Sequence, residues 1–242
     1  MVHVDMIGPW TVNFTQVRDN VTTIVKKEFK ALTILERATS WPEFAVARTF
    51  TAEHVSLLFD KGWLCRYPRP KMIVHDNGGE FNRFEFQEMM SSYAIVAKPT
   101  TVKNPSATSA AERVHLTMSD MLRTQEFSGH DWFEVMDQLL QSVAWAIRVT
   151  VSTVTRYSPG QLALGHDMIM QTKVIVEWGY LQDKCRKLSR IANERENKSR
   201  IEKVYKKGDK VLIVLDRMDR GAKLNVKVYT NGTIKIKRKN YA

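Results

Sequence analysis

The chain has 242 residues, of which 43% are hydrophobic and 26% charged, a balance typical of a globular protein and not of a disordered one. Its 37 Lys and Arg outnumber its 26 Asp and Glu, so the formal net charge is +11, which favours a polyanionic partner such as nucleic acid or an anionic membrane surface. Only two cysteines are present, Cys65 and Cys185, which excludes a disulfide scaffold and a cysteine-based zinc site and predicts an intracellular, reducing compartment. No apolar run reaches the roughly 18 residues of a transmembrane helix, and no basic-then-apolar signal pattern opens the chain.

The positive charge is concentrated in the last quarter of the chain. Residues 1–179 hold 18 Lys and Arg against 19 Asp and Glu, whereas residues 180–242 hold 19 against 7. Such a basic tail is either a solvated surface or a module that docks on phosphates, where each neutralised phosphate releases a counterion.

The first hundred residues predict a sheet followed by alternating helices and strands. Alternating hydrophobicity predicts a first strand that Gly8 and Pro9 end, and Thr51 is expected to cap the first helix. The expected strands cover 2–7, 29–35, 44–46, 72–74 and 95–97, the expected helices cover 51–63 and 84–93, and a turn is expected at 41–43.

The second half predicts helices and then a β-rich tail. Helices are expected over 109–126 and 132–149, after Ser158-Pro159, and over 177–203, the last one exposed and basic. The tail from 210 to 239 reads as strands, with a hairpin at Asn231-Gly232. Strands that alternate with helices after an initial all-strand run predict a mixed sheet covered by helices.

Three acids are candidates for the chemistry. Asp5 lies inside the first apolar strand, and Asp76 ends a buried strand just before Asn77-Gly78-Gly79. Glu112 lies at the edge of the apolar stripe of a predicted helix. Each acid alone is more often a capping or solvated residue, but a carboxylate in an apolar strand is costly to bury unless it is paired or binds a metal. Carboxylates are the ligands that Mg²⁺ prefers, and two such ions can drive phosphodiester displacement.

The chain closely resembles the integrases of gypsy-type long-terminal-repeat retrotransposons, which are related to retroviral integrases. The similar segments are V-D-M-I-G-P-W (4–10), S-W-P-E (40–43), H-D-N-G-G-E-F (75–81), T-T-V-K-N-P (100–105), A-E-R-V-H (111–115), R-Y-S-P-G-Q-L-A-L-G-H-D-M (156–168) and G-D-K-V-L-I (208–213). The 35 residues between Asp76 and Glu112 match the spacing of the family's second and third catalytic acids.

This resemblance implies a fold, a site and partners. The implied fold is α/β: a ribonuclease H-like five-stranded mixed sheet flanked by helices over 1–170, a basic helical linker over 171–205, and an incomplete SH3-like, DNA-binding β module over 206–242. Asp5, Asp76 and Glu112 match the metal-binding acids, with Mg²⁺ or Mn²⁺, in two ions, as the only cofactor. The implied partners are element-end and target DNA and further copies of the chain, with no membrane, in the nucleus of a eukaryotic host.

Further residues near the motifs are weaker candidates. Glu80 matches the second acid of its motif, although a role at a helix start is favoured over ligation, and Ser119 lies near the face of Glu112. The candidate DNA contacts are Asn77, Lys98, Lys103, Asn104, Arg113 and His115. For Asn77 a turn role competes with DNA contact, and for His115 an ordinary surface position does.

Other features separate the chain from the family. It begins four residues before Asp5, has no His-His plus Cys-Cys zinc pattern, and lacks the family's Gly-Pro-Tyr/Phe strand before the T-N-G-T hairpin. These features predict a fragment or decaying copy that fails at concerted two-end integration. Three functions therefore compete: an active polynucleotidyl transferase, a decayed or domesticated integrase that only binds DNA or a partner, and a ribonuclease H or cut-and-paste transposase.

Overall fold

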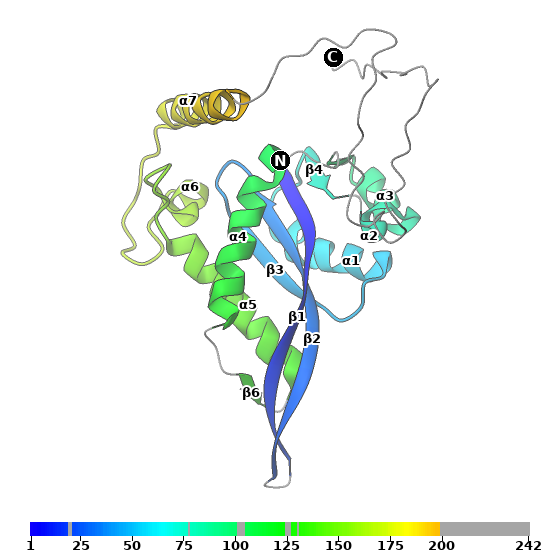
Figure 1. The fold of residues 1–242 in the computed structure, drawn as a ribbon. Helices are drawn as coiled ribbons and strands as arrows, with labels where there is room; N and C mark the ends of the chain where they lie inside the picture. The colour runs from blue at the N-terminus through cyan, green and yellow to red at the C-terminus, as the bar shows by residue number, and fades with distance from the viewer. Residues whose placement is uncertain (19–20, 77, 101–104, 124–126, 130, 199–242) are drawn as a thin grey trace. The chain divides into compact units, whose positions relative to one another are not determined.

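The computed structural model describes residues 1–18, 21–76, 78–100, 105–123, 127–129 and 131–198 (Figure 1). The chain divides into two units, Met1–Cys185 and Arg186–Ala242, and the boundary between them falls inside a helix. The predicted hairpin at Asn231-Gly232 and the rest of the expected β module lie outside the described residues. Within the described part, no helix is long and apolar enough to cross a membrane.

Strands come first along the chain and helices dominate later. The strands are β1 (Val2–Arg18), β2 (Val21–Glu36), β3 (Pro42–Ala47), β4 (Met72–His75), β5 (Val96–Pro99) and β6 (Phe127–Gly129). The helices are α1 (Ala52–Phe59), the π-helix η1 (Asp60–Leu64), α2 (Gly79–Asn82), α3 (Phe84–Ser92), α4 (Pro105–Arg123), α5 (Trp132–Val149), α6 (Pro159–Leu164) and α7 (Trp178–Asn197).

The sheet is mixed and has six strands. Its main path runs β3-β2-β1-β4-β5, with β1, β2 and β3 antiparallel and with β4 and β5 parallel to β1. The short strand β6 pairs in parallel with the far half of β1, which adds one strand to the five that were expected. An antiparallel meander of three strands followed by two parallel crossover strands, with helices on both faces, is the ribonuclease H-like arrangement. The predicted fold class of the core is therefore confirmed.

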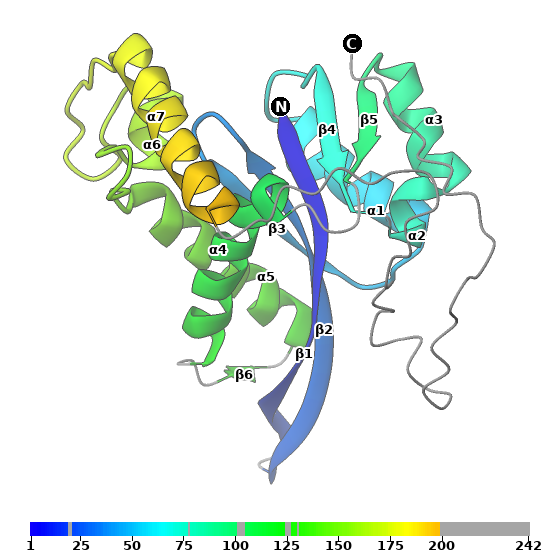
Figure 2. The same ribbon diagram turned by 45° about the horizontal axis from the view of Figure 1, so that its top comes forward.

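Two helical layers cover the two faces of the sheet (Figure 2). On one face α4 and α5 bury a cluster that contains Ile7, Phe29 and Met136. On the other face α1, η1, α2 and α3 bury a cluster that contains Val4, Phe59 and Phe86. Because side chains alternate along a strand, neighbouring residues of β1 enter different layers, and this alternation decides which side chains can meet.

The first strand is longer than its sequence pattern predicts. Gly8 and Pro9 do not end it: the ladder with β2 shifts register between Ile7 and Trp10 and then continues to Arg18. The added length is held by aromatic packing, because Trp10 lies 5.2 Å from Phe29 between ring centroids, and Phe29 lies 5.8 Å from Trp132 on α5. A long β1–β2 hairpin that extends past β6 results (Figure 1).

Several predicted boundaries are wrong and others are confirmed. The expected turn at 41–43 instead covers 37–39, and Pro42 opens β3, where a proline costs no ladder bond at the first position. The helix after Thr51 gives way at Asp60 to one π turn, and α4 begins four residues earlier than expected, at Pro105. By contrast α5 covers its predicted range of 132–149.

Local capping explains why two helices start where the sequence predicts. The Thr51 side chain accepts a hydrogen bond from the His54 backbone N–H at 3.3 Å. At α6, Ser158 and Gln161 form a reciprocal capping box, and Pro159 occupies the first turn. Such caps satisfy backbone donors that have no partner inside the helix.

A buried ionic cluster ties β3 to α5. The Glu43 side chain is 3% exposed and lies 2.5 Å from the Arg148 guanidinium of α5, and it accepts hydrogen bonds from the Trp41 indole (3.1 Å) and the Tyr67 hydroxyl. Arg148 also donates to the Pro42 carbonyl at 2.8 Å. The S-W-P-E segment therefore has a structural role, because the alternation of β3 turns its acid inward where a charge requires a partner.

We expect this cluster to give the stability a pH dependence in alkali. Burial, followed by the hydrogen bond to the Glu43 carboxylate and its charge, raises the pKa of Tyr67 above its ordinary 10.0. Because the folded state holds this proton more tightly than the unfolded chain, the contribution is complete below the unfolded pKa and is lost as pH rises through the folded pKa. Urea unfolding at about pH 8 and about pH 11 should show the advantage of wild type over Tyr67→Phe shrinking at the higher pH. A pH-independent difference would contradict this role.

Candidate catalytic site

Asp5 lies on β1, on the face of the sheet covered by α4 and α5. Val4 packs into the opposite layer and Ile7 packs beneath α4 and α5, so the alternation of β1 directs Asp5 toward the side of Ile7. Its side chain is half-buried, and its antiparallel neighbour across the ladder is Thr33 of β2.

Asp76 follows the last residue of β4 and is exposed. The ring of His75, just before it, packs against Phe81 and Phe86 in the layer of α1–α3. If the alternation of β4 continued for one more residue, Asp76 would point toward the opposite side, which is the side of Asp5. A carboxylate that leaves the end of a buried strand in this way is accessible to a ligand.

The strand register pairs the residues that stand just before the two aspartates. In the parallel pairing of β1 with β4, Val4 is opposite His75, so Asp5 and Asp76 come next in register on adjacent strands. Asp5 lies on the face that α4 covers, since Met118 and Leu122 of α4 share a core cluster with Ile7 on the same side of β1. A meeting of Asp5 and Asp76, 71 positions apart in the sequence, at this edge of the sheet is what the register predicts.

The third acid is placed only as part of its helix. Glu112 falls within α4, which packs on the face of Asp5, but its side chain lies outside the part that the structure describes. Among the described residues, no group of three or more His, Cys, Asp or Glu could hold a metal ion. The convergence of all three acids stays a prediction.

The turn after Asp76 brings a second carboxylate close. The Asp76 Oδ1 accepts a hydrogen bond from the Gly78 backbone N–H at 3.0 Å. A Cβ on Gly78 would lie 2.9 Å from this oxygen and 2.9 Å from Oε2 of Glu80, which belongs to α2. The glycine is needed for space and not for its conformation, because its φ of −54° suits any residue.

Buried polar atoms without partners lie beside both aspartates. Thr33, the cross-strand neighbour of Asp5, is 1% exposed, and no described residue hydrogen-bonds its Oγ1. The Nε2 of His75 is likewise buried and has no partner among the described residues. Unsatisfied buried groups are rare in folded proteins and concentrate where function requires them. Neither residue was predicted from the sequence, although a histidine at the end of a buried strand is a usable signal.

A third polar side chain shares this face of β1. His3 is buried, and this burial, followed by the charges of Arg37 and the N-terminal amino group, lowers the pKa of His3 below its ordinary 6.5. Burial and these two positive charges thus disfavour the charged form of the His3 imidazole.

The predicted DNA contacts fall into two groups. Lys98 on β5 is exposed, and His115 on α4 is half-buried. The side chains of the others lie outside the described part: Asn77, Lys103, Asn104 and Arg113.

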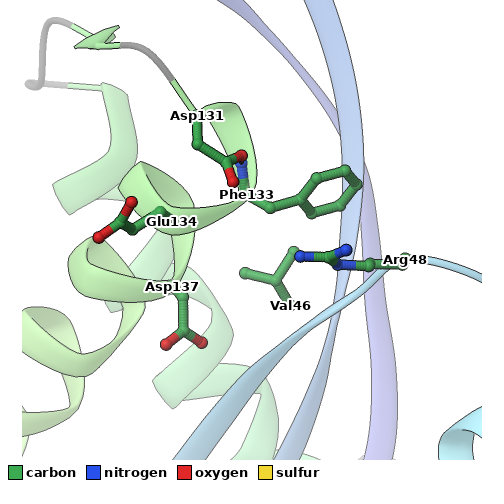
Figure 3. A pocket seen from close by; sticks show the side chains of 6 residues that line it. All are labelled: Val46, Arg48, Asp131, Phe133, Glu134 and Asp137. Carbon is green, nitrogen blue, oxygen red and sulfur yellow. Dashed lines mark hydrogen bonds between the residues drawn. The ribbon is translucent and has the colours of Figure 1, made fainter.

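A separate pocket of about 350 Å³ lies between β3 and the start of α5 (Figure 3). It is lined by Val46, Arg48, Asp131, Phe133, Glu134 and Asp137. The Arg48 guanidinium lies 4.7 Å from the centre of the Phe133 ring, and Asp131 caps α5 by accepting from the Phe133 N–H at 2.9 Å. None of the predicted site residues lines this pocket, so it is distinct from the edge that carries Asp5 and Asp76.

The donor set at the two aspartates fits a hard divalent cation. Carboxylate oxygens are the ligands that Mg²⁺ and Mn²⁺ prefer, and few protein ligands suffice when water and substrate phosphates complete the shell. The half-buried Asp5, the exposed Asp76 and Glu80 close to Asp76 supply oxygen donors only. The described residues at this edge therefore suit these ions.

Comparison with known proteins gives likeness of fold alone. No protein-family model matches the chain, and no curated protein does. Among solved structures, the chain is similar to the catalytic core domain of BIV integrase, with a TM-score of 0.48 and 16% identity over 67% of this chain and 93% of that one. It is also similar to a chain of the simian T-cell lymphotropic virus intasome in complex with PP2A regulatory subunit B56 gamma, with a TM-score of 0.49 and 18% identity over 72% of this chain and 58% of that one.

Proposed function

We propose that the chain is the catalytic region of a gypsy-type retrotransposon integrase that processes DNA 3′ ends and transfers them to target DNA. The sequence motifs support the family, in particular V-D-M-I-G-P-W, H-D-N-G-G-E-F and A-E-R-V-H. The observation that carries the proposal is the register of β1 and β4, which pairs Val4 with His75, one residue before Asp5 and one residue before Asp76.

In this proposal Asp5 and Asp76 would share the divalent ions, and Glu112 would complete the second site. Two Mg²⁺ or Mn²⁺ ions would supply activation of the attacking hydroxyl and stabilisation of the leaving oxygen. The protein contributes positioning. The Gly78 N–H orients the Asp76 carboxylate at 3.0 Å, and the sheet fixes the distance between the two aspartates.

DNA is the proposed substrate, both as element ends and as target. Further copies of the chain are proposed partners, because two DNA ends must be held at once, and the nucleus is the proposed compartment. Lys98 and His115 are the described candidates for contacts beside the site. The basic residues after α6 are the proposed phosphate anchor.

The proposal is tested by a strand-joining assay with the full chain. A pre-cleaved duplex with a recessed 3′ end should join to a second duplex in Mg²⁺ or Mn²⁺, and excess chelator should abolish joining. DNA binding without joining in either metal would favour the non-catalytic alternative. Cleavage of an RNA–DNA hybrid without joining would favour a ribonuclease H.

Gly78 and Gly79 form a matched pair for testing the site. A Cβ at Gly78 would push the carboxylates of Asp76 and Glu80, which are ends of side chains that can move at little cost to stability, whereas a Cβ at Gly79 meets nothing within 4 Å. We expect Gly78→Ala to lower strand joining by roughly tenfold or more while the urea midpoint hardly changes. Gly79→Ala should keep wild-type joining. Equal strand-joining activity of Gly78→Ala and Gly79→Ala would show that the orientation of the Asp76 carboxylate does not matter for catalysis.

The basic tail gives a prediction about salt. Leu181 of α7 is 4% exposed, so a truncation that preserves the core should follow residue 198. Residues 199–242 contain 13 Lys and Arg against 4 Asp and Glu. Truncation should weaken duplex DNA binding and flatten the plot of log K against log salt by about 0.9 for each phosphate that the tail no longer neutralises. Full-length protein with Lys235, Lys237 and Lys239 changed to Gln should show a smaller change in the same direction. A slope unaffected by both changes would place the anchor within residues 1–198.

A further inference from the structure

His75 is a polar residue in an apolar environment. It is the last residue of β4 and is 1% exposed. Its ring centroid lies 5.3 Å from that of Phe81 and 6.3 Å from that of Phe86, both in the core cluster beneath α2 and α3. A phenylalanine or leucine would suit such a position better, because neither has a nitrogen to leave unsatisfied.

The two ring nitrogens have different environments. Nδ1 lies 2.5 Å from the backbone carbonyl oxygen of Asp76, and since a carbonyl only accepts, Nδ1 must carry the proton and donate it. Nε2, the other ring nitrogen, is buried with no hydrogen-bond partner among the described residues. One useful hydrogen bond is thus kept at the expense of one buried unsatisfied atom.

That hydrogen bond completes a clamp on the main chain of Asp76. The peptide group that precedes Asp76 ends in the His75 carbonyl. This carbonyl accepts from the Thr100 N–H at 2.7 Å and from the Thr100 hydroxyl at 3.0 Å. In the peptide group that follows Asp76, the Asp76 carbonyl accepts from Nδ1–H of the His75 ring. Both peptide groups that flank the exposed Asp76 side chain are therefore held, and the side chain is oriented in turn by the Gly78 N–H.

We infer that His75 is a positioning residue: its Nδ1–H fixes the main chain of Asp76 so that the carboxylate stays beside Asp5 for cation binding. The inference rests on the proposed function of Asp76 as a metal ligand. It also accounts for the unsatisfied Nε2, because the stability given up there maintains the geometry of the site.

Three substitutions of His75 in the full chain distinguish the effect of its Nδ1–H donor from the effect of its ring packing. His75→Phe keeps a ring and removes both nitrogens. His75→Asn places an amide N–H where Nδ1 lies, and His75→Gln places one where Nε2 lies. Mn²⁺ binding to the protein without DNA is measured by calorimetry, and stability by urea unfolding.

We expect Mn²⁺ affinity to fall roughly 10–100-fold in His75→Phe and His75→Gln and to stay within about threefold of wild type in His75→Asn. The urea midpoint of His75→Phe should equal or exceed that of wild type, since an unsatisfied atom is removed. Weaker metal binding at undiminished stability is a pattern that a merely structural histidine does not produce. If His75→Phe does not fold, the Mn²⁺ affinities of His75→Asn and His75→Gln still test the role of the Nδ1–H donor.

Two controls separate failure of this inference from failure of the proposed function. Phe81→Leu disturbs the packing around the same ring without touching the donor, and it should keep wild-type Mn²⁺ affinity. Asp76→Asn should lose Mn²⁺ binding. If Asp76→Asn binds Mn²⁺ like wild type, the metal site itself is wrong. If Asp76→Asn loses Mn²⁺ binding while His75→Phe keeps it, only the role of His75 is overturned. The same holds if His75→Asn and His75→Gln have equal Mn²⁺ affinity.

Discussion

Asp76→Asn should lower metal-dependent strand joining by at least about 100-fold, the scale on which removing one group that stabilises transition-state charge acts. Asparagine has the size of aspartate, and its amide oxygen can still accept from the Gly78 N–H, which lies 3.0 Å from Oδ1 in the native turn. The fold and the turn should therefore persist while the charge that binds the cation is removed. Asp5→Asn should behave in the same way, because it removes the charge of the other aspartate that is proposed to bind the cation.

A matched control for these variants lies on α4. Asp120 is 74% exposed, and its ion pair with Arg123 is a surface one, so Asp120→Asn makes the same chemical change away from the site. It should join strands like wild type, and all three variants should bind duplex DNA with unchanged affinity. If Asp76→Asn joined strands as fast as wild type, the acids would not be catalytic and the non-catalytic alternative would be favoured.

Arg148→Met should destabilise the fold by about 3–5 kcal/mol, the cost of leaving a buried charge without its partner. The substitution removes the guanidinium 2.5 Å from the Glu43 carboxylate, of which only 3% is exposed. The remaining cation near this carboxylate is Arg66, at 3.8 Å and 54% exposed, which is too distant and too solvated to compensate. The free energy of unfolding in urea measures the effect.

The double variant Arg148→Met with Glu43→Gln tests whether the charge is the cause. Glutamine is neutral, and its carbonyl oxygen can still accept from Trp41 and Tyr67. We expect the second substitution to restore at least about 1 kcal/mol of the stability, a coupling typical of residues in one network. Arg123→Met, at the exposed Asp120 pair, should change stability by less than about 0.5 kcal/mol. A double variant no more stable than Arg148→Met would assign the destabilisation to packing alone.

Local signals predicted the elements whose boundaries depend on nearby residues. The start of α6 follows from Ser158 and Pro159, because a cap and a first-turn proline act on backbone groups within one turn. The end of β1 was mispredicted for the opposite reason. Glycine and proline usually stop a strand, but here packing of Trp10 on Phe29, which lies 19 positions away, continues it past Gly8.

The buried acid in S-W-P-E shows the same limit. Nothing within the segment distinguishes a turn from the start of β3, since the partner that allows Glu43 to be buried is Arg148, more than 100 positions away. A surface carboxylate and the centre of an ionic cluster therefore look alike in the sequence.

The sequence by itself determined the catalytic candidates, the mixed α/β class and the concentration of positive charge after residue 179, because residue identity, spacing and periodicity are properties of the chain. The tertiary structure decided the face of Asp5, which lies on the Ile7 side of β1 because Val4 packs into the opposite layer. The pairing of Val4 with His75, on which the predicted meeting of Asp5 and Asp76 depends, is likewise a property of the tertiary structure. It also decided that His75 lies behind Asp76 with one nitrogen engaged and one buried, since that environment is built by Phe81 and Phe86 from helices that follow β4.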